Sequence, residues 1–79
     1  PLEPLRNYVY RVGIFKDSSK AENLIAKFRS KDVLAYSSEN DDLIYVYVGP
    51  FIGKEKIIQS KTLYNEIAGV ENGVIEEWK

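Results

Sequence analysis

The hydrophobic and polar positions of the chain follow two different periods, and together they predict four strands and two helices. Residues 8–15, 33–37, 43–48 and 74–78 are rich in aromatic and β-branched side chains, as is typical of strands. After the first strand, apolar residues recur at helical spacing along an amphipathic helix ending near residue 31: Ala21, Leu24, Ile25 and Phe28. A second helix is predicted from residues 53–55 onward, with these inner positions: Ile57, Tyr64, Ile67 and Ala68.

Polar residues and a glycine indicate where these elements begin and end. Ser19 followed by Glu22 has the spacing of a capping box and predicts Ser19 as the N-cap of the first helix. Gly69 suits the left-handed position that ends many helices. The polar cluster at residues 38–42 supplies turn chemistry, so the second and third strands are predicted to form a hairpin.

The element order βαββαβ with short connections predicts an α+β fold, the split βαβ arrangement of a ferredoxin-like or RNP-like sandwich. In this architecture a four-stranded, antiparallel-type sheet carries both helices on one face, and the first and third strands are central. The other face of the sheet is open to solvent and free to bind a ligand.

Side chains alternate between the two faces of a strand, so the sequence also assigns residues to faces. The helices should cover the apolar side of each central strand: Tyr8, Tyr10 and Val12 in the first, and Ile44, Val46 and Val48 in the third. Arg11, Tyr45 and Tyr47 are then expected to meet on the open face, on the same side as Val9. Tyr36 joins them if its neighbours in the second strand point inward.

Composition narrows the possible functions. The 79 residues suit one small domain, and 11 Lys and Arg against 12 Asp and Glu, with no basic stripe, argue against a nucleic-acid partner. Cys and His are absent, which excludes thiol nucleophiles, disulfides, the usual zinc sites and imidazole chemistry, and neither a metal nor a cofactor is expected. No apolar run reaches the roughly 18 residues of a membrane span, so we expect no membrane contact by this domain.

The first seven residues hold two of the three prolines, which disfavour regular structure. We therefore expect residues 1–7 to be the remnant of a linker from a longer protein, and residues 8–79 to form one monomeric domain.

A short repeat points to a known family. RVGIF at residues 11–15 recurs as YVGPF at residues 47–51, an offset of 36 residues. The first strand, YVYRVGIF, resembles the SPOR signature aromatic-x-Val-Gln-x-Gly-Ser-Phe, and IYVYVGPF resembles its partner ending in Val-Gly-Pro-Phe. The resemblance extends over residues 8–78. It departs from the pattern where Arg11 replaces a glycan-contacting Gln, where Ile14 replaces Ser, and where Tyr45 and Tyr47 stand in place of Arg or Gln.

This resemblance implies a function without catalysis. SPOR domains bind septal peptidoglycan whose glycan strands have lost their stem peptides, and they are attached to division proteins, lytic transglycosylases or amidases. It therefore implies that the partner is peptidoglycan glycan, that the location is the bacterial envelope at the septum (the periplasm or outside the cytoplasmic membrane), and that any enzyme activity belongs to the parent protein.

The residues of the open face suit a carbohydrate ligand. Sugar rings present apolar C–H faces and polar rims, and Tyr supplies a flat platform and a hydroxyl at low conformational cost. Arg11 can make paired bonds to a carboxylate, and N-acetylmuramic acid carries a free lactyl carboxylate only when its peptide has been removed. The predicted glycan-binding set is Arg11, Tyr45, Tyr47, Tyr36, Val9 and Trp78. Alternatively, these tyrosines are only good strand formers and Arg11 pairs with a nearby acid.

Other notable residues receive structural interpretations. Gly13 and Gly49 are predicted to mark bulges or tight strand ends, with Pro50 part of the same motif. Phe15 and Phe51 are predicted core anchors. The acid pairs at residues 41–42 and 76–77 are adjacent in sequence and imply no cleft of the kind that glycoside hydrolysis needs, so they are interpreted as solvated charge and no catalytic residue is expected.

Two other functions stay open on the sequence alone. An RRM-like RNA-binding module shares the element order and stacks bases on its central strands, although its basic-Gly-aromatic-Gly-aromatic signature is missing here. A regulatory or protein-interaction domain would use the same face or an exposed edge strand.

Overall fold

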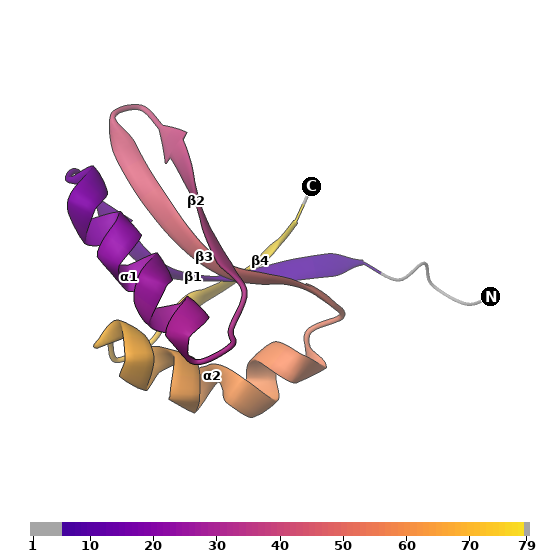
Figure 1. The fold of residues 1–79 in the computed structure, drawn as a ribbon. Coiled ribbons are helices and arrows are strands. Elements are labelled where there is room, and N and C mark those ends of the chain that lie inside the picture. Colours follow the sequence, from indigo (N-terminus) through magenta and orange to yellow (C-terminus); the bar gives the residue numbers. More distant parts are fainter. Residues whose placement is uncertain (1–5, 79) are drawn as a thin grey trace.

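A computed structural model describes residues 6–78 and confirms the predicted α+β architecture, in which two helices cover one face of a four-stranded antiparallel sheet (Figure 1). The elements are β1 (Asn7–Phe15), α1 (Ser18–Ser30), β2 (Ala35–Asn40), β3 (Leu43–Ile52), α2 (Glu55–Ala68) and β4 (Val74–Glu77). The strand order is β2-β3-β1-β4, so β1 and β3 are central as predicted. Residues 1–5 of the expected linker lie outside the described residues. Within residues 6–78, no helix is long and apolar enough to cross a membrane.

The core lies between the sheet and the helices, on the side that strand alternation predicts. Its helical members come from the apolar stripes of α1 and α2, and Phe28 and Ile57 are fully buried. Phe28 packs edge to face on Tyr64, with ring centroids 6.3 Å apart. The sheet contributes buried side chains from three strands: Tyr10, Val12, Ala35, Ile44, Val46 and Val48.

The buried side chain of Tyr10 connects the sheet to the end of α2 and to the start of β4. Its hydroxyl donates to Oδ1 of Asn65 at 2.7 Å and accepts from the backbone N–H of Gly73 at 2.8 Å. Because Gly73 directly precedes β4, this contact fixes where the last strand begins. β4 then pairs with β1, with Val9 opposite Glu76 and Arg11 opposite Val74.

The repeated Val-Gly-x-Phe motif marks a β-bulge in each central strand. In an unbroken strand, Val12 and Phe15 are three residues apart and would point to opposite faces. The pairing of β1 with β3 shifts at Val12, and it shifts again where Gly49 and Pro50 lie opposite Val9. Each bulge changes the phase of its strand, so that Phe15 and Phe51 both pack against the core. The bulges predicted at the two glycines and the core role of the two phenylalanines are confirmed.

The first helix begins differently from the prediction. Its N-cap is Asp17, whose Oδ1 accepts hydrogen bonds from the backbone N–H of Ser19 at 2.9 Å and from its hydroxyl at 2.8 Å. The prediction of Ser19 as the N-cap is therefore wrong, because the carboxylate two residues earlier accepts from one of the free N–H groups in the first turn of the helix. At the end of α2, Gly69 adopts the predicted left-handed conformation, with φ of 71°.

The hairpin is longer and its turn tighter than predicted. β2 continues to Asn40, which pairs with Leu43, so the turn consists of Asp41 and Asp42 alone. Both turn residues have positive φ, 50° and 65°, as two-residue hairpin turns of type I′ require. The polar residues at positions 37–40 are tolerated in β2 because it is an edge strand and they are exposed.

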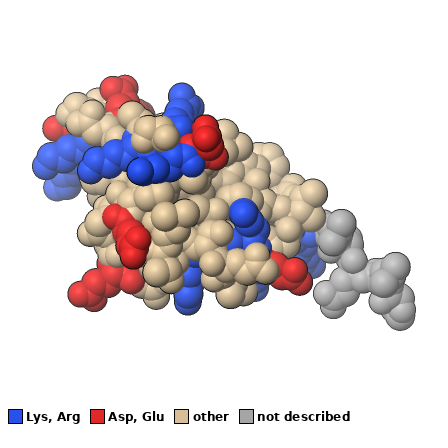
Figure 2. Space-filling model, turned by 60° about the horizontal axis from the view of Figure 1, so that its bottom comes forward, with Lys and Arg blue, Asp and Glu red and all other residues tan. Residues whose placement is uncertain are grey.

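Charged side chains of both signs share the helix-bearing side of the molecule. In Figure 2 basic side chains gather at one end of this side with acidic side chains beside them, and uncharged residues cover most of the rest. This distribution offers no continuous basic track for a phosphate backbone on the side shown. The charges that bear on function lie on the opposite side, on the open face of the sheet.

Candidate functional site

The open face of the sheet brings together side chains from all four strands. Across the sheet, Tyr36 of β2 lies opposite Tyr47 of β3, which lies opposite Arg11 of β1. In the neighbouring row, Ser38 lies opposite Tyr45, and Tyr45 opposite Ile14. Arg11, Tyr45 and Tyr47 are thus on the face opposite both helices, as predicted, and Tyr36 joins them.

The three tyrosines form a continuous aromatic surface, here called the tyrosine strip (Tyr36, Tyr45 and Tyr47). The rings of Tyr36 and Tyr47 have centroids 5.4 Å apart and an interplanar angle of 25°. Those of Tyr45 and Tyr47 are 6.5 Å apart at 23°. All three are partly exposed. Near-parallel rings of this kind stabilise one another and present their faces and hydroxyls to a ligand.

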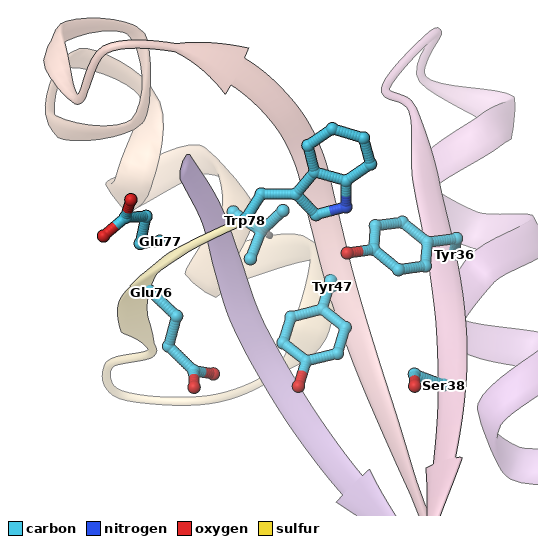
Figure 3. Close-up of a pocket in the computed structure, with 7 residues that line it drawn as sticks. Tyr36, Ser38, Tyr47, Glu76, Glu77 and Trp78 are labelled. Carbon is cyan, nitrogen blue, oxygen red and sulfur yellow. The ribbon is translucent and has the colours of Figure 1, made fainter. Parts of the chain in front are cut away.

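One end of the tyrosine strip borders a hollow of about 280 Å³ (Figure 3). Its lining comes from β1, β2, β3 and the end of the chain: Val9, Tyr36, Ser38, Tyr47, Glu76, Glu77 and Trp78. Val9 is 3% exposed, so it contributes part of the floor and little contact surface. Trp78 is 44% exposed, and Figure 3 shows its indole nitrogen directed toward the hydroxyl of Tyr36. Trp78 therefore extends the aromatic surface beyond the strip.

The position of Trp78 is set by backbone pairing with the start of β1. Its N–H donates to the carbonyl oxygen of Asn7 at 2.8 Å, which continues the pairing of β4 with β1 by one residue. The strand that carries Trp78 therefore lies beside the first strand of the domain.

Arg11 is the charged residue at the centre of this face. Its Nη1 lies 3.3 Å from Oε2 of Glu76, and its guanidinium carbon lies 5.9 Å from the centroid of the Tyr45 ring. The side chains of the pair are partly exposed, 29% for Arg11 and 37% for Glu76. The alternative in which Arg11 pairs with a nearby acid therefore describes the domain without a ligand.

The surroundings of the tyrosine strip change the ionisation of two of its hydroxyls. Burial raises the pKa of Tyr36, the neighbouring Tyr47 raises it further, and an interaction with Trp78 lowers it. Burial also raises the pKa of Tyr47, and Glu76 raises it further, whereas Arg11 lowers it. Both hydroxyls therefore remain protonated at neutral pH and can donate as well as accept hydrogen bonds.

Three residues that line the hollow were not predicted as site residues from the sequence: Ser38, Glu76 and Glu77. From the sequence alone, Glu76 and Glu77 are interpreted as solvated charge and Ser38 as part of a turn. The two residues of the acidic pair at 76–77 separate, because successive strand residues face opposite sides: Glu76 lies on the open face with Arg11, and Glu77 pairs with Arg6 at 3.5 Å. The position of Glu76 opposite Val9 would have placed it on the open face. That inference requires knowing that β4 pairs with β1, which the local sequence pattern does not show.

The arrangement suits a ring-shaped ligand with a polar rim. The tyrosine strip and Trp78 offer aromatic faces, Ser38 and the tyrosine hydroxyls offer hydrogen bonds, and Arg11 with Glu76 offers a donor beside an acceptor. The roles of Arg11, Tyr36, Tyr45, Tyr47, Val9 and Trp78 in ligand binding stay predictions.

The fold defines the class of protein, a small ferredoxin-like α+β domain whose open sheet face is aromatic. The model of the SPOR domain family matches residues 4–70, and the chain belongs to this family. This confirms the resemblance found in the two Val-Gly-x-Phe motifs.

Two solved structures have similar folds. The peptidoglycan-binding domain of CwlC, a cell wall lytic enzyme of B. subtilis, aligns over 100% of this chain and 98% of its own, with a TM-score of 0.75 and 19% identity. The SPOR protein DedD aligns over 92% of this chain with a TM-score of 0.66 and 23% identity, and the chain spans 39% of that protein's length. Among curated proteins, none matches the sequence.

Proposed function

We propose that this domain binds bacterial peptidoglycan through the open face of its sheet, and that it recognises glycan strands whose stem peptides have been removed. The observation that carries the proposal is the tyrosine strip beside a hollow that Trp78 extends. The domain supplies binding and no catalysis. It would hold a larger envelope protein at peptidoglycan stripped of its peptides, at the division septum.

Family membership supports this proposal, and so does the function of one protein with a similar fold. The CwlC domain is described as peptidoglycan-binding and aligns with this chain from end to end. At 19% identity this similarity shows a shared fold only. The proposal for the ligand therefore rests on the residues of this chain. Any activity of the larger protein that carries this domain, such as cell-wall lysis, is a separate proposal. The residues of the open face provide no support for it.

Tyr47 has the central role in this proposal. It contacts Tyr36 on one side and Tyr45 on the other, and it lines the hollow. A sugar ring stacked on Tyr47 would therefore touch the strip whichever direction the glycan runs. The hydroxyls of Tyr36 and Tyr47, which stay protonated, are available to hydroxyl and acetamide groups at the rim of the ring.

In this proposal Arg11 recognises the negative charge of the ligand. Its guanidinium is held over the Tyr45 ring, where a carboxylate on a stacked sugar would come within reach. The lactyl group of muramic acid ends in a free carboxylate only after the peptide is cut away. A contact from Arg11 would therefore favour stripped over intact glycan.

The test is cosedimentation of the domain with sacculi before and after an amidase removes the stem peptides. We expect more domain to sediment with stripped sacculi. Tyr47→Ala should weaken binding to both preparations by about 1–2 kcal/mol, or about 5- to 30-fold, as the loss of one stacking aromatic does elsewhere. Leu63→Ala removes an exposed apolar side chain from α2, away from the open face, and should leave binding unchanged.

Arg11→Gln separates the two parts of the site. This variant should keep binding through the tyrosine strip but lose preference for stripped sacculi and part of the salt sensitivity. If Arg11→Gln keeps both properties, discrimination comes from steric exclusion of the peptides and not from the carboxylate. If the native domain sediments with neither preparation, the glycan proposal is wrong.

The other candidate functions are weaker on this structure. RNA binding would need several basic side chains along the phosphate backbone, but the chain has 11 Lys and Arg against 12 Asp and Glu, with no basic stripe. Poly-uridine in the same assay should therefore not compete with stripped sacculi. A protein-interaction role through the same face is the interpretation that remains if no glycan binds.

A further inference from the structure

In the domain without a ligand, Arg11 already has partners on two sides. Glu76 of β4 approaches its guanidinium from one side, with 3.3 Å between Nη1 and Oε2, and the ring of Tyr45 in β3 lies on the other. These two partners come from different strands. Loss of one therefore leaves Arg11 held by the other.

The contact between Arg11 and Glu76 is close but includes no hydrogen bond. Oε2 of Glu76 is shielded from solvent, and within residues 6–78 it makes no hydrogen bond, although it lies at ion-pair distance from Nη1. A buried carboxylate oxygen without a hydrogen bond is costly, since it has lost water without gaining a directed donor. The pair is therefore a weak one that another carboxylate with better geometry can replace.

From these contacts we infer that Glu76 occupies the place of the ligand's carboxylate, and that an acidic sugar binds by exchanging with it on Arg11. The inference rests on the proposed function. It makes Glu76 a specificity-determining residue, because it holds the charge-reading subsite closed to ligands that bring no carboxylate. The neutral parts of the glycan need no exchange and stack on the tyrosine strip alone.

The exchange is structurally simple. Glu76 lies near the end of an edge strand and is 37% exposed, so its side chain can turn toward water without unfolding. Arg11 keeps its place over the Tyr45 ring. The ligand's carboxylate thus meets a guanidinium that is already positioned, and the cost of binding includes releasing Glu76.

This cost predicts that removal of the Glu76 charge strengthens binding of acidic glycan. Two soluble probes test it: peptide-free glycan oligosaccharides from amidase-treated sacculi, and the same oligosaccharides with their carboxyl groups reduced to alcohols. Glu76→Gln should bind the native probe about fivefold more tightly, which is ~1 kcal/mol at about 1.4 kcal/mol per tenfold and the upper range for exposed ion pairs. Its affinity for the reduced probe should stay within about twofold.

An acidic residue on the other side of the molecule provides a control. Glu66→Gln makes the same change of net charge on α2, where the side chain is exposed on the side that bears the helices. This variant should leave both affinities unchanged. An equal gain in the two variants would mean a general charge effect, and weaker binding by Glu76→Gln would mean that Glu76 itself holds the sugar; either result overturns the exchange.

A second measurement separates this inference from the proposed function. The NMR signal of the Arg11 Nε–H group can be followed during titration with sodium acetate, with sodium chloride at equal ionic strength as the reference. The exchange requires a larger acetate-specific shift in Glu76→Gln than in the native domain, whether or not glycan binds. Equal shifts in the two proteins contradict the exchange even if stripped glycan binds, whereas unequal shifts without glycan binding reject only the glycan proposal.

Discussion

Alanine substitutions at three glycines should test the two bulges, because the structure separates steric crowding from backbone strain at these positions. An added Cβ at Gly53 would have no neighbour within 4 Å, but its φ of +76° is strained for an L residue. At Gly13, φ lies outside the left-handed range, but the Cβ would lie 2.7 Å from Cε2 of Phe15. Gly49 combines both, with φ of +123° and contacts of 3.2–3.3 Å to Phe51.

These geometries set an order of destabilisation. Gly53→Ala should cost about 1 kcal/mol, since strain of ~1–2 kcal/mol is partly offset by the lower entropy of the unfolded chain. Gly13→Ala should cost about 1–3 kcal/mol, because the Phe15 ring is packed against the core and must move. Gly49→Ala should cost most, roughly 2–4 kcal/mol, since the strain and the contacts act together.

Thermal unfolding followed by far-UV circular dichroism, with urea titration as a check, measures these costs. In a domain of this size each kcal/mol lowers Tm by roughly 4–8 °C, so each variant should be resolved from the native protein, and Gly49→Ala should be resolved from Gly53→Ala. The argument fails if Gly53→Ala is as destabilising as Gly49→Ala, or if Gly13→Ala leaves Tm unchanged. The second result would mean that Phe15 does not need the bulge to reach the core.

Three further predictions concern the core, the first helix and the tyrosine strip. Phe28→Ala should cost about 3–5 kcal/mol, a large part of the roughly 4–12 kcal/mol expected for the whole domain, and an unchanged denaturation midpoint would show that this helix face was misassigned. Asp17→Ala should lower Tm more than Ser19→Ala, because the Asp17 carboxylate accepts both N-terminal hydrogen bonds; the reverse order would restore Ser19 as the cap. Tyr36 and Tyr47 should ionise above the ordinary value of 10.0, so their contribution to stability is complete below about pH 10 and is lost as the pH rises through their raised pKa values. Absorbance titration of the native domain, Tyr36→Phe and Tyr47→Phe checks this, because each variant should lack a tyrosine that ionises above pH 10. If a variant instead lacks a tyrosine that ionises near pH 10, the prediction for that residue is wrong.

The sequence was sufficient wherever a local pattern and the geometry agree. Strand alternation placed Tyr45 and Tyr47 opposite the buried Val46, because side chains in a strand point to opposite faces in turn. The capping glycine at position 69 was predictable for the same reason, since its conformation depends on its immediate neighbours. The strand glycines Gly13 and Gly49 indicated bulges or tight strand ends, and the bulges break the alternation that the rest of each strand follows.

The sequence was insufficient wherever the outcome depended on a distant strand. Nothing near Glu76 indicates that it faces Arg11, because that proximity follows from β4 pairing with β1 and from Tyr10 fixing the start of β4. The turn at Asp41 and Asp42 was placed too early, since five consecutive polar residues do not show where an exposed edge strand stops. The capping-box spacing of Ser19 and Glu22 placed the start of α1 two residues too late, because it does not show that the Asp17 side chain accepts from the N–H of Ser19.

The hydrogen bond between Trp78 and Asn7 has a practical consequence for anyone attaching this domain to a surface, a dye or a second protein. It places Asn7 beside Trp78, which lines the hollow, so a label attached directly to either residue would crowd the candidate site. The hairpin turn at Asp41 and Asp42 is at the opposite end of the sheet (Figure 1). The nine residues of β1, from Asn7 to Phe15, make eight steps and separate the two ends by roughly 26 Å at the usual rise of a strand. A cysteine introduced at that turn, in a chain that has none of its own, would carry a label while leaving the aromatic face free.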